Sequence, residues 1–100
     1  MAKINFKRSG GIDGTEVDTD IDLNELPPGE MQALMALITD SNFFNIPQNL
    51  IEQATADEYE YTVTMEAGNT HHTIHTSDAT APASLRPLLE KLSMLAQVKR

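Results

Sequence analysis

The stretch that decides the fold is residues 58–76, EYEYTVTMEAGNTHHTIHT. Apolar and polar side chains alternate along both halves of this stretch, which predicts two strands with one apolar face each. Gly68-Asn69 between them is typical of a two-residue hairpin turn. This turn pairs Val63 with Ile74 and brings the apolar residues of both strands to the same face, so the pattern and the register agree.

Two more strands are predicted upstream of this hairpin. Residues 3–9 and 16–23 alternate between apolar and polar side chains, and the second stretch places Val17 and Ile21 on one face. Residues 9–14 between them contain three glycines, which permit the positive φ angles of a turn. The N-terminal part of the chain is therefore expected to form a second hairpin.

Two segments carry apolar residues at helical spacing. The first follows residues 26–28 (Leu-Pro-Pro), where proline is tolerated at a helix start, and it ends near Ser41. The second is predicted to be capped by Ser84. The predicted buried stripes comprise Met31, Leu34, Met35 and Ile38 in the first helix, and Leu85, Leu88, Leu89, Leu92 and Leu95 or Ala96 in the second.

The order strand, strand, helix, strand, strand, helix predicts an α+β fold in which residues 1–100 form a single domain. Two amphipathic helices over one face of a four-stranded, mainly antiparallel sheet would bury every predicted apolar stripe. We favour the strand order 2-1-3-4, because the second and third strands would be parallel to each other if they were neighbours.

The composition excludes several classes of protein. The chain has 7 Lys and Arg against 15 Asp and Glu, a formal net charge of −8, which disfavours binding to nucleic acids or anionic membranes. It contains no cysteine, so disulfides and thiolate metal sites are excluded. No apolar run is long enough to span a membrane, and the N-terminus lacks the apolar core of a signal peptide, so the expected location is the cytoplasm.

Two groups of side chains resemble metal ligands, but neither fits a single ion. Asp18, Asp20 and Asp22 lie on the polar face of a predicted strand, where successive members are about 6.5 Å apart. His71 and His75 share a strand face but are about 13 Å apart, whereas zinc bonds are about 2 Å long. We therefore expect solvated aspartates, surface histidines and no bound metal or other cofactor.

No catalytic arrangement is recognisable in the sequence. It lacks a nucleophile elbow, a phosphate-binding glycine loop and a dinucleotide-binding fingerprint. The glycines of residues 10–14 lead into a strand and not into a helix, so they offer no helix N-terminus to a phosphate. We expect a protein that is not an enzyme and has no catalytic residues.

The predicted topology gathers three connections at one end of the sheet, residues 9–14, 45–57 and 77–83. Loops on a rigid scaffold are where binding residues concentrate. The candidates in these connections are the acidic residues Asp13 and Asp78 and the apolar residues Ile12, Ile46, Leu50 and Ile51. Ile46, Leu50 and Ile51 can equally pack into the end of the core, whereas Ile12 at a hairpin tip has little core within reach.

The chain contains six short motifs whose order and spacing point to a known family. They are Lys7-Arg8-Ser9-Gly10-Gly11-Ile12-Asp13-Gly14, Leu26-Pro27-Pro28, Phe43-Phe44, Tyr61-Thr62-Val63-Thr64, Ser77-Asp78 and Leu85-Arg86-Pro87-Leu88-Leu89. Together they resemble the emfourin family, protein inhibitors of protealysin, a thermolysin-like bacterial zinc metalloprotease. The resemblance spans nearly the whole chain and implies a cofactor-free inhibitor that meets such a protease in the bacterial cytoplasm; we expect a monomer.

The resemblance also implies a mechanism, in which a loop aspartate ligates the zinc of the protease and apolar loop residues fill its substrate pockets. Asp78 matches the Ser-Asp element of the family and is the first candidate ligand, and Asp13 is the second. The candidate pocket contacts are Gly11, Ile12, Leu50 and Ile51. An alternative function is a non-catalytic adaptor that binds partners through the acidic strand face of Asp18, Asp20 and Asp22.

Overall fold

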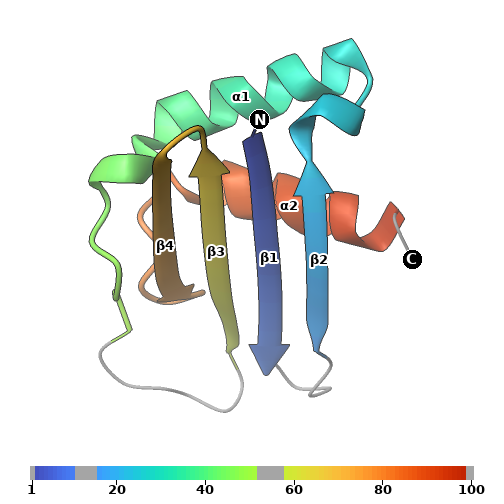
Figure 1. Cartoon of the computed structure of the whole chain (residues 1–100). Helices are drawn as coiled ribbons and strands as arrows, with labels where there is room; N and C mark the ends of the chain where they lie inside the picture. Colours follow the sequence, from blue (N-terminus) through green and yellow to red (C-terminus); the bar gives the residue numbers. More distant parts are fainter. Residues whose placement is uncertain (1, 11–15, 52–57, 99–100) are drawn as a thin grey trace.

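The structure, a computed structural model, describes residues 2–10, 16–51 and 58–98 and shows a sheet with two helices on one side of it (Figure 1). In chain order the elements are β1 (Ala2–Gly10), β2 (Val17–Asp22), the 3-10 turn η1 (Leu23–Glu25), α1 (Pro28–Ser41), the 3-10 turn η2 (Phe43–Asn45), β3 (Tyr59–Ala67), β4 (Thr70–Ser77) and α2 (Arg86–Val98). The α+β fold and its β-β-α-β-β-α order confirm the prediction from the sequence.

The four strands form one antiparallel sheet in the predicted order, β2-β1-β3-β4. Val63 pairs with Ile74 across β3 and β4, which is the register that the turn at residues 68–69 predicts. Gly68 has a φ of +62°, a left-handed conformation that glycine adopts without a steric penalty. Because β1 pairs with both β2 and β3, the N-terminal strand lies inside the sheet and not at its edge (Figure 1).

Helix α1 packs on the apolar face of the sheet (Figure 1). It begins at Pro28, whose fixed φ suits a first helical turn, and it is followed by Asn42, whose φ of 57° ends it. Leu34 is fully buried as predicted, but Met35 is 51% exposed, and Leu37 packs against the core instead. The prediction for Met35 was wrong because apolar residues occur on adjacent faces of α1. Their spacing alone therefore does not determine which of these faces turns toward the sheet.

Helix α2 lies on the same side of the sheet as α1 (Figure 1). Its buried stripe is the predicted one, with Leu95 only partly buried: Leu85, Leu88, Leu89, Leu92 and Ala96. Ser84 lies two residues before the first helical residue, Arg86, and not at the predicted cap position. The start of the helix is instead prepared by a turn in which the N–H groups of Leu85 and Arg86 donate to the Pro82 carbonyl.

The hydrophobic core fills the space between the sheet and the two helices. Its most deeply buried members, each at most 1% exposed, come from both layers and include Phe6, Leu34, Phe43, Ile74 and Leu92. Both helices lie on one side of the sheet (Figure 1). The other face carries polar side chains such as Asn5, Asp20 and Thr64. In the part of the chain that the structure describes, neither helix is long and apolar enough to cross a membrane.

Candidate functional site

The end of β1, the start of β2, the start of β3 and the end of β4 meet at one end of the sheet, which is called the loop end below (Figure 1). The antiparallel register places Gly10 opposite Tyr59 and Glu60 opposite Ser77. The loop end is therefore built from strand termini that are held in fixed register by a continuous ladder of hydrogen bonds.

Half of the predicted site residues lie in the described part of the chain. Asp78 directly follows the last residue of β4, and Leu50 is bonded to the same strand three residues earlier, at His75. Ile51 follows Leu50 along the chain. The remaining candidates, Gly11, Ile12 and Asp13, lie outside the described residues.

Asp78 is exposed, yet hydrogen bonds fix its position. Its Oδ2 accepts from the backbone N–H of Tyr59 at 3.0 Å, and its Oδ1 accepts from the Tyr61 hydroxyl at 2.8 Å. Its own N–H donates to the Tyr59 carbonyl, and its carbonyl accepts from Nη2 of Arg86. A carboxylate offers about four acceptor positions, so the orientation is fixed while lone pairs remain for a further ligand.

Tyr61 is the buried partner of Asp78, with only 9% of its surface exposed. Burial is the main cause that raises the pKa of Tyr61 above its ordinary value of 10.0. The hydrogen bond to Asp78 and the negative charge of Asp78 raise it further, while the charge of Arg8 acts in the opposite direction. Tyr61 is therefore a neutral hydroxyl that donates to Asp78 throughout the physiological pH range.

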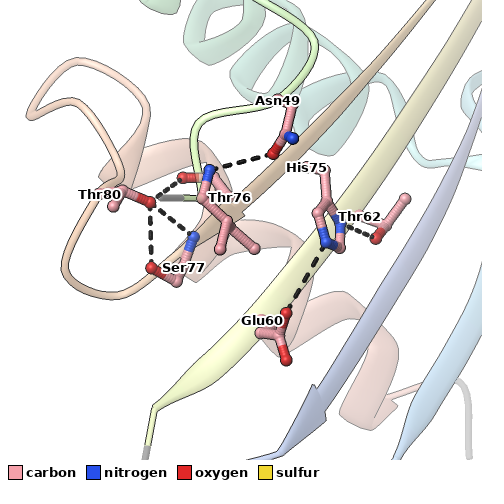
Figure 2. A network of polar contacts seen from close by, with 8 residues as sticks. Asn49, Glu60, Thr62, His75, Thr76, Ser77 and Thr80 are labelled. Carbon is pink, nitrogen blue, oxygen red and sulfur yellow. Dashed lines mark hydrogen bonds and ion pairs between the residues drawn. The ribbon is translucent and has the colours of Figure 1, made fainter. Parts of the chain in front are cut away.

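A compact turn after β4 carries Asp78. Figure 2 shows Thr80 at its centre, with Oγ1 lying 3.2 Å from Oγ1 of Thr76 and 3.0 Å from Oγ of Ser77. Oγ1 of Thr80 also accepts from the Ser77 N–H, and the N–H groups of Thr80 and Ala81 both donate to the Ser77 carbonyl. The predicted irregular connection after β4 is thus a hydrogen-bonded turn, which presents Asp78 from a rigid base.

The chain that follows η2 runs along the outer edge of β4. The Leu50 N–H donates to the His75 carbonyl at 2.8 Å, and the His75 N–H donates to the Gln48 carbonyl at 2.7 Å. Asn49 forms a short parallel bridge with His75, and its Oδ1 accepts from the Ile51 N–H (Figure 2). This segment covers backbone groups of β4 that would otherwise form an open sheet edge.

The apolar residues of this segment differ in what they touch. Ile46 is only 9% exposed and belongs to the core, and its carbonyl lies 2.7 Å from Nε2 of His72. Leu50 is partly buried and packs against the core. Ile51 is also partly buried but, unlike Leu50, it is not among the described residues that pack against the core.

The three aspartates of β2 have structural partners. Nδ2 of Asn5 donates to Oδ1 of Asp18 at 3.1 Å and to Oδ1 of Asp20 at 2.7 Å. Asp22 accepts from the Asn24 N–H and thereby caps η1. The acidic strand face is therefore organised by side-chain and capping bonds within the chain.

The histidines are likewise engaged separately. Nδ1 of His75 lies 2.8 Å from Oγ1 of Thr62, and its Nε2 lies 3.7 Å from Oε1 of Glu60 (Figure 2). His72 packs edge-on against the ring of Phe43. Among the described residues, no group of three or more His, Asp or Glu side chains is placed to hold one metal ion.

Reasoning from the sequence missed the residues that support Asp78. Tyr59 and Tyr61 fall on the same strand face as Val63, a pattern that predicts apolar packing and indicates no partner for their polar groups. Arg8 lies at the loop end on the same face of β1 as the apolar residues Ile4 and Phe6. A cation on an otherwise apolar strand face is the signal in the sequence that could have indicated a site at this end. Its guanidinium carbon lies 4.6 Å from the centre of the Tyr59 ring.

Comparison with known proteins gives one result. The model of the family described as Emfourin matches residues 6–93, which is nearly the whole chain. No curated protein and no solved structure gives a significant match.

Proposed function

The chain belongs to the emfourin family, and on that basis we propose that it inhibits thermolysin-like zinc metalloproteases of the protealysin type. The observation that carries the proposal is the family match over residues 6–93. Emfourins are metalloprotease inhibitors, so membership implies inhibition and not catalysis. The thermolysin-like target, the blocked active site, the monomeric state and the cytoplasmic location belong to the proposal.

In the proposed complex, one aspartate of the inhibitor ligates the catalytic zinc of the protease. Catalytic zinc sites keep one position open, and a carboxylate oxygen is a competent ligand there. Asp78 is the first candidate, because hydrogen bonds from Tyr59 and Tyr61 orient its carboxylate, as outer partners commonly do for metal ligands. Asp13 is the second candidate and lies outside the described residues.

Apolar side chains near the zinc ligand would fill the substrate pockets of the protease. Among the described candidates, Ile51 fits this role best because it does not pack against the core, and Leu50 is second. Gly11 and Ile12 complete the proposed contact set from outside the described residues.

The proposed function is tested by incubating the chain with thermolysin and following both peptide cleavage and the survival of the intact chain. An inhibitor should abolish cleavage at stoichiometric concentration and remain uncut. Rapid degradation of the chain with unchanged protease activity would refute the proposal.

Asparagine variants test the zinc ligand without removing the support around it. In Asp78→Asn, the amide oxygen can accept from the Tyr59 N–H and the amide nitrogen can donate to the Tyr61 hydroxyl, so the turn is retained. If Asp78 is the ligand, the inhibition constant should rise about thirtyfold or more, because losing a buried charge contact at an interface costs about 2–5 kcal/mol. Asp13→Asn is tested in parallel, and Asp40→Asn on α1 is the matched control for charge.

If neither single variant nor the double variant weakens inhibition, zinc ligation by these aspartates is refuted while inhibition itself stands. The alternative of an adaptor that uses the acidic strand face gains no support from the contacts of Asp18 and Asp20, since Asn5 already bridges their carboxylates.

A further inference from the structure

Arg8 is a cation at the loop end whose position the fold fixes and which forms no ion pair among the described residues. On β1 it pairs with Val17 of β2 and with Tyr61 of β3, so its backbone lies inside the sheet. Its guanidinium carbon lies 4.6 Å from the centre of the Tyr59 ring, within the range of a cation–π contact. Arg8 is partly exposed, so part of this side chain remains accessible to solvent.

Tyr59, whose ring contacts the Arg8 guanidinium, is also hydrogen-bonded to Asp78. The backbone of Tyr59 donates its N–H to the Asp78 carboxylate and accepts from the Asp78 N–H at its carbonyl. The ring that carries the Arg8 guanidinium is therefore attached to the same rigid turn as the proposed zinc ligand. Arg8 and Asp78 are placed relative to each other by hydrogen bonds and not by a flexible connection.

The hydrogen-bonding capacity of Arg8 is incompletely used. Its Nε is buried and has no hydrogen-bond partner, which is rare because an unsatisfied buried donor costs free energy. The ion pairs between described residues are His75–Glu60 and Lys91–Glu30, so Arg8 belongs to neither. Arg86 at the same end differs, because it donates to the Asp78 carbonyl.

The chemistry of the missing partner follows from the donor. A guanidinium presents a planar fork of N–H donors that matches a carboxylate in two parallel hydrogen bonds. Within the described part, the guanidinium lies over the Tyr59 ring, and its charge acts on Tyr61, which is a neutral hydroxyl. The Asp78 carboxylate already accepts from Tyr59 and Tyr61. In a chain with a net charge of −8, this accessible cation marks a point where an acidic partner group can be received.

We propose that Arg8 is a docking residue that receives a carboxylate side chain of the protease at the rim of its active site. The inference rests on the proposed inhibitory function and deepens it. Because Nε is buried, the carboxylate accepts from the terminal N–H groups of the guanidinium. This contact fixes how the loop end is rotated over the active site, while Asp78 or Asp13 meets the zinc.

The test compares inhibition constants against thermolysin for the wild-type chain, Arg8→Gln, Arg8→Lys and Lys7→Gln. Arg8→Gln should weaken inhibition about tenfold or more, and Arg8→Lys should weaken it less because it keeps the charge but loses the planar fork. Lys7→Gln is the matched control: it removes the same charge one residue away from an exposed side chain, and it should change inhibition by less than about threefold. The inhibition by Arg8→Gln should also depend less on ionic strength than that of the wild type.

The outcomes separate the inference from the proposed function. A wild-type chain that does not inhibit refutes the function. A wild-type chain that inhibits, together with an Arg8→Gln variant that inhibits as well as Lys7→Gln, overturns the role of Arg8 alone. If Arg8→Gln does not fold, as judged by circular dichroism, Arg8→Lys decides, because an inhibition constant equal to that of the wild type at every ionic strength overturns the carboxylate contact.

Discussion

At the scale of single residues, the pair of Tyr61 and Asp78 joins stability to the candidate site. Tyr61 is buried and donates to a carboxylate that stands at the surface. A buried tyrosine with this partner must stay protonated for the contact to persist, because ionisation would set two negative charges against each other. The pKa of Tyr61 therefore makes the stability of the loop end depend on pH.

The first prediction concerns this pH dependence. The pKa of Tyr61 is raised in the folded chain above the ordinary value of 10.0, so its contribution is fully present below pH 10 and is lost as the pH rises further. The free energy of unfolding of the wild type should fall by about 1.4 kcal/mol for each pH unit above 10, relative to Tyr61→Phe. Urea denaturation between pH 8 and pH 11 measures this difference.

At pH 8, Tyr61→Phe should be about 1 kcal/mol less stable than the wild type, which is the usual contribution of one hydrogen bond. The gap should close and then reverse above pH 10. The variant Tyr59→Phe removes a phenol from the same region, and its free energy of unfolding should decline above pH 10 as steeply as that of the wild type. Parallel curves for the wild type and Tyr61→Phe would contradict the assignment.

The second prediction separates Leu50 from Ile51. Leu50 packs against the core, so Leu50→Ala should lower the free energy of unfolding by about 1–2 kcal/mol. Ile51→Ala should change stability by less than about 1 kcal/mol and should raise the inhibition constant about tenfold or more, since filling an apolar pocket with such a side chain contributes about 1.5–3 kcal/mol. Thermal melting and inhibition assays on both variants provide the measurements, and the reverse pattern would exchange their roles.

At the scale of elements, the hairpin of β3 and β4 and the helix α1 show which features the sequence determines. The register of β3 and β4 follows from Gly68-Asn69 and from the matching apolar phases of the two strands, so it was predicted correctly. The rotation of α1 was not, because Met35 and Leu37 are both apolar and only packing decides between them. Similarly, the bridge from Asn49 to His75 depends on long-range contacts that leave no local pattern.

The third prediction compares three glycines in three elements. Gly10 has a φ of +86°, and a Cβ there would lie 2.7 Å from the Glu58 carbonyl oxygen. Gly68 has a φ of +62° with open space around it, and Gly29 in the first turn of α1 also has open space. Gly10→Ala should therefore destabilise most, by about 2–3 kcal/mol, Gly68→Ala by about 1 kcal/mol, and Gly29→Ala should be neutral or slightly stabilising.

Urea denaturation of the three variants gives this ranking directly. Because Gly10 pairs with Tyr59, the clash in Gly10→Ala would push β1 and β3 apart at the loop end, and inhibition should weaken as well. Equal effects of Gly10→Ala and Gly68→Ala would show that the left-handed φ, and not the contact with β3, dominates at Gly10.

At the scale of the whole molecule, the sequence predicted the layers and the end of the sheet that carries Asp78. It did not predict how Asp78 is held, because Tyr59, Tyr61 and Asp78 come together only through the pairing of β3 with β4. Arg8 escaped notice for the same reason, since its partner Tyr59 lies about half the chain away. The strand patterns set the scaffold, and contacts between distant residues on that scaffold build the candidate site.

The last prediction concerns the net charge of −8. Among the described residues, the ion pair that a lysine forms is Lys91–Glu30. It is partly exposed, so the attraction between these charges adds little to stability. Repulsion among the excess acidic groups should dominate, and salt should screen it. Raising sodium chloride from about 20 mM to about 200 mM should therefore raise the thermal midpoint by about 2–6 °C, as followed by circular dichroism.

Asp40→Asn provides the matched variant for this salt effect. Asp40 is exposed in the last turn of α1, where no basic residue is present and where the helix dipole disfavours a negative charge. The variant should melt at a higher temperature than the wild type at low salt, and the difference should shrink as salt is added. A thermal midpoint of the wild type that falls with salt would mean that local attractive contacts, such as those around Lys91, outweigh the repulsion of the whole charge.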